Sequence, residues 1–195
     1  MATAPRERLI HTTIELIRSR GISGVGVAEL LARSGTARQS IYTHFPQGKN
    51  QLIEESSRAA GSWITSMIEQ LCSGPPPDAL QTFIDYWKTM IEASDYTAGC
   101  PIAAATFGGH EAPGAVDAAH IAFEEWEQLI ANNLRASNLD DDLSHSLATM
   151  IIAAIEGAVI ISVATRSTRP LDRVGKHLTD LLEGHLSDNH GSALD

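Results

Sequence analysis

The chain has 195 residues, of which 43% are apolar, and carries a formal net charge of −10 at pH 7. This length suits one or two small cores, and the apolar content argues against an intrinsically disordered chain. Cys72 and Cys100 have neither a Cys-x-x-Cys spacing nor a histidine cluster beside them, so we expect reduced thiols and no disulfide framework. We also find no secretion signal at the N-terminus and expect a cytoplasmic protein.

The charge is distributed unevenly along the chain. Residues 1–49 contain seven Lys and Arg against three Glu, a net charge of +4. Residues 50–195 contain the other seven basic residues against twenty-one acidic ones, a net charge of −14. A basic N-terminal part on an acidic body predicts contact with nucleic acid through that part alone, because the acidic body repels phosphate.

The N-terminal part is predicted to begin with two helices. Residues 5–20 carry an apolar stripe at helical spacing, with Pro5 suited to the first turn and Gly21 marking the end. Residues 27–33 form a second, shorter apolar-periodic segment with Leu30 and Leu31 on its inner face. Together with a short third helix at residues 37–45, these helices have few apolar positions, so the core of the N-terminal part is expected to be small.

A tight turn and a third helix follow. Gly35 adopts positive φ without strain, and Thr36 is predicted to cap the helix that comes next. Ile41 and Phe45 are four residues apart and give this helix one apolar side. A helix, a glycine-containing turn and a helix with a polar outer face together predict a helix-turn-helix unit, whose second helix enters the major groove.

The outward residues of the third helix are candidates for DNA contact. Arg and Gln side chains each form two hydrogen bonds with a base edge, so Arg38, Gln39, Ser40 and Thr43 are the candidate base readers. The whole predicted DNA-binding set is Thr36, Arg38, Gln39, Ser40, Tyr42, Thr43, His44 and Lys49. The competing interpretation is a solvated helix face, and for His44 a helix-end residue that bonds a carbonyl.

The segment Ser40-Ile41-Tyr42-Thr43-His44-Phe45-Pro46, followed by Gly48-Lys49 and Leu52, resembles the DNA-binding domain of the tetracycline-repressor (TetR) family of bacterial regulators. The resemblance covers residues 6–52. The additional glycine before the lysine, and Gly99-Cys100-Pro101, resemble the LmrA/YxaF-like branch. The resemblance implies phosphate contacts by Tyr42, His44 and Lys49, and a C-terminal body that binds a ligand.

Six further helices are predicted after Pro46, at residues 49–72, 78–95, 102–107, 115–136, 143–166 and 171–186. Residues 73–77 are predicted to be a rigid proline-rich linker with Asp78 as the next helix cap, residues 108–114 a loose loop, and residues 187–195 a polar tail. The helix at 49–72 starts beside the DNA-binding unit and runs into the body, so it is predicted to connect the two functions.

Residues 147–164 are apolar on nearly all sides. Their length suffices for a membrane span, but Glu156 in the middle and the lack of an aromatic belt or basic flank argue against one. A helix that is apolar all round is buried all round, which in a small bundle requires a second chain. We therefore predict a homodimer through the last two helices, with interface residues Met150, Ala154, Gly157, Ala158, Ile161, Val174, Leu178 and Leu181.

Bulky side chains of the body are candidates for lining a ligand cavity between helices: Trp63, Met67, Phe83, Trp87, Phe107, Phe123 and Trp126. Taken one by one, each is better interpreted as an ordinary core residue. As a group, bulky residues among many Ala and Gly favour uneven packing and a pocket for an apolar, partly aromatic effector.

Other site types find little support in the sequence. His120 and Glu124 are four residues apart but lack a third ligand at fixed spacing, so we expect no metal site and no cofactor. Glu156 is interpreted either as a ligand contact or as the partner of a basic residue such as Arg166 of a second subunit. We find no nucleophile elbow, phosphate loop or dinucleotide signature, and expect no enzymatic activity.

The sequence thus predicts an all-α protein with a three-helix DNA-binding domain at residues 1–48 and a regulatory and dimerisation domain at residues 49–195. The predicted function is transcriptional regulation, with repression at an inverted-repeat operator on double-stranded DNA relieved by a small-molecule effector. The alternative is a helical ligand-binding or assembly protein without DNA-binding activity.

Overall fold

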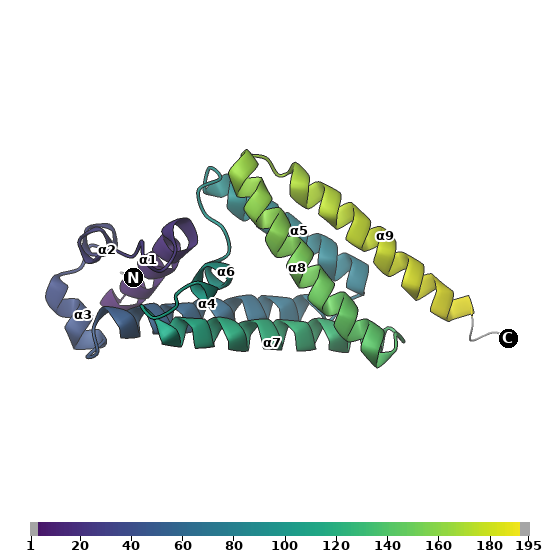
Figure 1. The fold of residues 1–195 in the computed structure, drawn as a ribbon, viewed down its shortest axis with the longest axis horizontal. Helices are drawn as coiled ribbons and strands as arrows, with labels where there is room; N and C mark the ends of the chain where they lie inside the picture. The colour runs from purple at the N-terminus through teal and green to yellow at the C-terminus, as the bar shows by residue number, and fades with distance from the viewer. Residues whose placement is uncertain (1–3, 192–195) are drawn as a thin grey trace. The chain divides into compact units, whose positions relative to one another are not determined.

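The computed structural model describes residues 4–191, which form nine α-helices and no strand. The predicted all-α fold is therefore confirmed for the described part of the chain (Figure 1). Two compact units emerge from the packing. The first contains the residues up to Ile64 together with Ala98–Ala122, and the second contains Thr65–Thr97 and the residues from Phe123 onward.

The first unit is built on helix α1 (Pro5–Arg20), which packs against α2 (Val27–Ser34), α3 (Arg38–His44) and α6 (Pro101–Thr106). It also holds the N-terminal parts of α4 (Lys49–Leu71) and α7 (Pro113–Ala136). The apolar stripes seen in the sequence meet in a core of fully buried side chains: Leu9, Leu16, Ile17, Leu30, Ile41, Phe45, Leu52 and Ile53. The core anchors all three N-terminal helices.

The turn between α2 and α3 follows the prediction in one respect and differs in another. Gly35 has φ +61°, the left-handed conformation that a glycine adopts without strain. The prediction that Thr36 caps α3 is wrong: Ala37 is the capping residue and provides no side-chain hydrogen bond. The Thr36 hydroxyl instead lies 2.8 Å from the hydroxyl of Ser34, so it stabilises the turn itself.

The second unit contains α5 (Pro76–Ala93), α8 (Asp141–Thr165) and α9 (Arg169–Gly191), which pack against one another, and the C-terminal parts of α4 and α7 (Figure 1). Its core consists of the inward faces of these helices: Leu80, Ile84, Trp87, Ile91, Trp126, Leu134, Leu147, Ile151, Ile155, Val159, Leu171, Leu178 and Leu182.

Several helix ends differ from the prediction. Helix α5 starts at Pro76, because a proline fits the first turn of a helix, where its missing N–H is not needed. Asp78 is therefore not the cap of α5 but an acidic residue in its first turn, where it complements the helix dipole. Helix α9 continues to Gly191, so the polar segment from residue 187 is helical as far as the structure describes it.

Helix α8 is the one helix of the described residues that is long and apolar enough to cross a membrane, with a mean hydropathy of 2.2. Its buried side chains recur at helical spacing and form one face in the core of the second unit: Ser144, Leu147, Ala148, Ile151, Ile155, Ala158, Val159 and Ser162. Met150, Ile160 and Ile161 are exposed, with Ile160 at 61%. Helix α8 is thus a core helix of the second unit with an additional uncovered apolar face.

Candidate DNA-binding face and apolar cavity

Helix α3 is attached to the first unit by its apolar side and exposes the other. Ile41 is only 2% exposed and Phe45 is fully buried, whereas the Tyr42 side chain is 52% exposed. Of the predicted contact residues, Arg38, Gln39, Tyr42 and Thr43 are exposed, and Thr36, Ser40, His44 and Lys49 are half-buried. The side chain of Thr43 donates a 3.0 Å hydrogen bond to the Gln39 carbonyl, which orients it on the helix.

Tyr42 and the start of α4 are brought together by a tight turn. The amide of Gly48 donates to the Phe45 carbonyl at 2.8 Å, and Gly48 has φ +79°, which strongly favours glycine. A Cβ atom on Gly48 would lie 3.6 Å from the Tyr42 ring, so the ring covers the turn that precedes Lys49. Tyr42 and Lys49, separated by seven positions in the sequence, therefore belong to one surface.

The basic residues of the N-terminal part fall into two groups. Three of them form ion pairs with glutamates of the same unit: Arg6–Glu55, Arg20–Glu29 and Arg33–Glu15. The guanidinium groups of Arg8 and Arg18 each donate a 2.9 Å hydrogen bond to a backbone carbonyl, of Ser34 and Gly99 respectively.

The side chains of Arg38 and Lys49 have no ion-pair partner within residues 4–191. These two cations, at the start of α3 and of α4, are left available for an external anion. Five of the seven basic residues that suggested nucleic-acid binding in the sequence thus have structural partners, and the remaining two belong to the predicted contact set.

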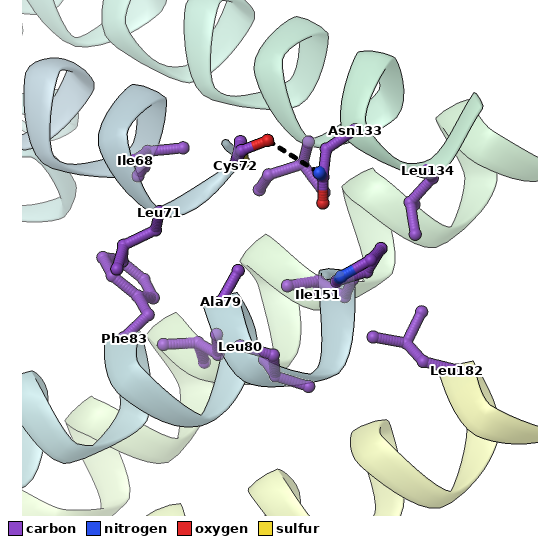
Figure 2. Close-up of a pocket in the computed structure, with 13 residues that line it drawn as sticks. Ile68, Leu71, Cys72, Ala79, Leu80, Phe83, Asn133, Leu134, Ile151 and Leu182 are labelled. Atoms are coloured by element: carbon purple, nitrogen blue, oxygen red, sulfur yellow. Dashed lines mark hydrogen bonds between the residues drawn. The ribbon is translucent and has the colours of Figure 1, made fainter. Parts of the chain in front are cut away.

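The second unit contains a small, partly open cavity at the C-terminal end of α4, with a volume of about 50 Å³ (Figure 2). Phe83 is the one member of the predicted ligand set that lines it. The other lining residues were not predicted from the sequence: Ile68, Leu71, Cys72, Pro76, Ala79, Leu80, Ile130, Asn133, Leu134, Ile151, Ile155 and Leu182. Small and aliphatic residues give no signal in the sequence that separates a cavity wall from an ordinary core.

The predicted bulky ligand residues are not gathered around this cavity. Phe107 is 87% exposed and Trp63 is 54% exposed, and both belong to the first unit. Trp87 is fully buried in the core of the second unit, and Met67 is half-buried on α4. Phe123 and Trp126 pack edge to face at 5.1 Å, and the Trp126 indole N–H donates a 3.0 Å hydrogen bond to Thr65.

Two lining residues carry side-chain hydrogen-bonding groups into the cavity wall. The Asn133 amide nitrogen donates to the backbone carbonyls of Cys72 at 2.7 Å and Gly74 at 2.9 Å, just beyond the end of α4. Burial raises the pKa of the Cys72 thiol to about 11, so the thiol is neutral at physiological pH. Since no charged residue lines the cavity, it favours a neutral, largely apolar occupant.

The volume limits what the cavity holds as it stands. Pockets for drug-sized ligands are typically about 300–1,000 Å³, far larger than the 50 Å³ found here. A molecule of more than a few heavy atoms therefore displaces the walls when it enters. Those walls include Ile68, Leu71 and Cys72, the last turn of α4 and the residue after it.

The predicted dimerisation residues divide between core and surface. Ala158 and Leu178 are buried within their own chain, so they belong to the subunit core. Met150 and Ile161 are exposed, and Ala154, Gly157, Val174 and Leu181 are half-buried. A side chain added at Gly157 would meet nothing within 4 Å, so this part of α8 is open in the single chain.

One of the two interpretations of Glu156, its pairing with Arg166 of a second subunit, stays a prediction. Arg166 forms a 2.7 Å ion pair with Asp95 of its own chain, and its guanidinium lies over the Tyr96 ring at 5.6 Å. Arg166 ends α8 with φ 48°, so it serves to close the turn toward α9. Residues 4–191 contain no group of three or more metal-ligating side chains placed to hold a metal ion.

Two family models match the chain. Residues 9–56 match the tetR family of bacterial regulatory proteins, and residues 76–177 match the C-terminal domain of LmrA/YxaF-like transcriptional regulators. The first match covers the candidate DNA-binding face, and the second covers most of the residues that line the cavity.

Individual relatives agree with these matches over nearly the whole chain. An uncharacterized HTH-type transcriptional regulator of Mycobacterium tuberculosis is 34% identical over 191 residues, which covers 94% of this chain and 97% of that protein. The HTH-type transcriptional regulator LmrA of Bacillus subtilis is 25% identical over 91% of this chain and 96% of its own length. The regulatory protein TetR from Rhodobacter sphaeroides has the same fold, with a TM-score of 0.82, 20% identity, and coverage of 91% of this chain and 98% of that one.

Proposed function

Because the chain belongs to the LmrA/YxaF-like branch of the TetR family and is a DNA-binding transcriptional regulator, we propose that it is a dimeric repressor that a small molecule releases from its operator. The family is one of transcriptional regulators rather than enzymes, which sets aside the alternative of a helical protein without a DNA-binding role. We further propose residues 1–48 as the DNA-binding domain, residues 49–195 as the regulatory and dimerisation domain, and a cytoplasmic location.

A single observation supports the DNA contacts. Of the basic side chains in the N-terminal part, Arg38 and Lys49 are the two without an ion pair or a carbonyl partner within the described residues. Arg38 lies on the exposed side of α3, where it reaches base edges, with guanine as its preferred partner. Lys49 is the first residue of α4. Its charge adds to the partial positive charge of the helix N-terminus, and together they favour binding of a phosphate.

The homodimer rests on the uncovered apolar face of α8. Met150, Ile160 and Ile161 are exposed on a helix whose opposite face is already in the subunit core. A second copy of α8 and α9 would cover this face in a four-helix arrangement, and the open position at Gly157 permits close approach. A two-fold dimer binds an inverted repeat, with half-sites about 34–36 Å apart if the two α3 helices enter successive turns of the major groove.

Release of the operator follows from the course of α4. This helix is continuous from Lys49 to Leu71, and its last turn lines the cavity. An effector larger than the cavity displaces that turn, and the proposed route from there to Lys49 is along α4 itself, because both belong to the same helix. The effector shifts the equilibrium only to the extent that it prefers the displaced form, so operator DNA weakens effector binding by the same factor as the effector weakens operator binding.

Selection from a random duplex library tests the DNA-binding part of the proposal. Wild-type protein is expected to enrich an inverted repeat, and Arg38→Ala is expected to lose the preference at particular bases within it. Arg33→Ala is the matched control, because Arg33 is paired with Glu15 at 2.6 Å. Enrichment of a single asymmetric half-site, or of no sequence, contradicts the dimeric repressor.

A further inference from the structure

We infer that the cavity recognises a neutral effector with an apolar body and one hydrogen-bond donor, such as a hydroxyl or N–H group, which donates to the side-chain oxygen of Asn133. This inference rests on the proposed function, because it names the ligand class of the same effector cavity. It depends on which way the Asn133 amide faces, on the surroundings of its oxygen, and on the space available.

The orientation of the Asn133 amide is determined by its partners. Its nitrogen is within hydrogen-bond distance of two carbonyl oxygens, those of Cys72 at 2.7 Å and Gly74 at 2.9 Å. A carbonyl oxygen only accepts hydrogen bonds, so the amide group facing both must be the NH₂ group, with its two donors. The opposite orientation would place three acceptor oxygens against one another. Both donors are thus in use, and the atom left for a ligand is the acceptor Oδ1.

That oxygen lies at the cavity. Figure 2 shows it directed away from Cys72 and toward the apolar side chains of the wall. The Asn133 Oδ1 atom accepts no hydrogen bond from the residues that the structure describes. The other side chains of the wall are aliphatic or aromatic, except for the Cys72 thiol. An acceptor in apolar surroundings gains from a ligand that brings a donor, and it disfavours a ligand that brings only another acceptor.

Charged effectors are disfavoured by the same wall. No basic or acidic residue lines the cavity, so an ionised carboxylate or ammonium group would lose its hydration without a counter-charge. The Cys72 thiol does not provide one, because burial raises its pKa to about 11 and keeps it protonated. The thiol is a weak hydrogen-bonding group, so Asn133 is the stronger polar contact in the cavity.

The position of Asn133 also connects recognition with the end of α4. The side chain that would accept the effector's hydrogen bond is the one that binds the two carbonyls just after α4. The cavity volume of 50 Å³ is about a third of the volume of an apolar cavity of ~150 Å³ that binds benzene in another protein. A ring-sized effector therefore moves Asn133 or the last turn of α4 when it binds.

Three probes of similar size and shape test the inference: phenol, which has a donor, anisole, which has only an acceptor, and toluene, which has neither. Calorimetric titrations without DNA give the affinity of each probe for the full-length wild-type protein and for Asn133→Leu. We expect the ratio of phenol to toluene affinity to fall roughly threefold to tenfold in Asn133→Leu, because a typical net hydrogen bond is lost. Asn132→Leu, at an exposed neighbour outside the cavity, should leave the ratio unchanged.

A second measurement covers the case in which Asn133→Leu does not fold. The side-chain amide signal of Asn133 in wild-type protein, followed by NMR, should shift more with phenol than with equally saturating anisole or toluene. Equal shifts with all three probes, an unchanged affinity ratio in Asn133→Leu, or no binding of any probe overturns the inference. Operator DNA is absent from these titrations, so such a result leaves operator binding and release, which the duplex selection tests, unaffected.

Discussion

Salt dependence offers a quantitative test of the division between basic residues that contact phosphate and those that support the fold. Lys49 and Arg33 are both basic residues of the N-terminal part with half- or fully exposed side chains. Arg33 is held by Glu15 at 2.6 Å, whereas Lys49 has no ion-pair partner within residues 4–191. We therefore expect Lys49→Ala, and not Arg33→Ala, to remove a phosphate contact.

The size of the effect follows from counterion release. Each phosphate neutralised on duplex DNA contributes about 0.9 to the slope of log affinity against log salt. A dimer that loses Lys49 from both subunits is therefore expected to have a slope shallower by about 1.8. Between 50 and 200 mM salt, a fourfold range, the wild-type protein should then lose about twelvefold more affinity than Lys49→Ala. Arg33→Ala should have the wild-type slope.

Fluorescence anisotropy with a labelled operator duplex, measured at five or six KCl concentrations, gives the three slopes. A mutated operator with one half-site scrambled serves as the specificity control, and Lys49→Ala should weaken both duplexes by the same factor. If Arg33→Ala flattens the slope as much as Lys49→Ala does, the ion pairs of the first unit do not separate structural from DNA-binding residues. If Lys49→Ala changes which bases are preferred, Lys49 is a base reader.

Three other predictions concern the thiol, the dimer and the support of α3. Burial raises the Cys72 pKa from its ordinary value of 9.0 to about 11, so the thiolate fraction near pH 8 is about a hundredfold lower than for a free thiol. Iodoacetamide should therefore label Cys72 about a hundredfold more slowly than a free thiol, and labelling at the rate of glutathione would contradict this. Gly157→Arg should give monomers or aggregates by light scattering, whereas Gln70→Arg, at an exposed position on α4, should remain dimeric; a dimeric Gly157→Arg protein places the interface elsewhere. Ile41→Ala should lower the free energy of unfolding by about 2–5 kcal/mol in urea titrations, while Tyr42→Ala, being largely exposed, should stay within about 1 kcal/mol; equal losses would mean that Ile41 is not what attaches α3.

The helices and the turn that precedes α3 were largely predictable because both depend on local information. Residues 5–20 were predicted as a helix and α1 occupies the same residues, since the apolar period, the starting proline and the terminal glycine act within a few positions of one another. Gly35 was predicted at a left-handed turn for the same reason. The errors are also local, since Thr36 and Asp78 are both good capping residues. The Thr36 hydroxyl instead bonds the hydroxyl of Ser34. Helix α5 begins at Pro76, ahead of Asp78.

The cavity was less predictable, because a void is a property of how helices meet. Large aromatic residues were chosen as its lining, yet Trp87 fills the core and Phe107 is exposed. The cavity instead lies where Leu80 and Ile155, among other aliphatic side chains, leave space at the end of α4. Nothing in the sequence around Asn133 marks it as the polar group of this wall, since its partners are backbone carbonyls sixty positions away.

The sequence by itself determined the all-helical fold, the order of its elements and the family, because helical periodicity, turn residues and a short basic-aromatic motif are each readable within one stretch of chain. The tertiary structure decided which of the basic residues are neutralised by distant glutamates and which remain available, and which face of α8 is covered. It also decided that Asn133 presents an acceptor rather than a donor. Charge pairing, burial and amide orientation depend on atoms that meet only after the chain has folded, and a pattern along the sequence does not contain them.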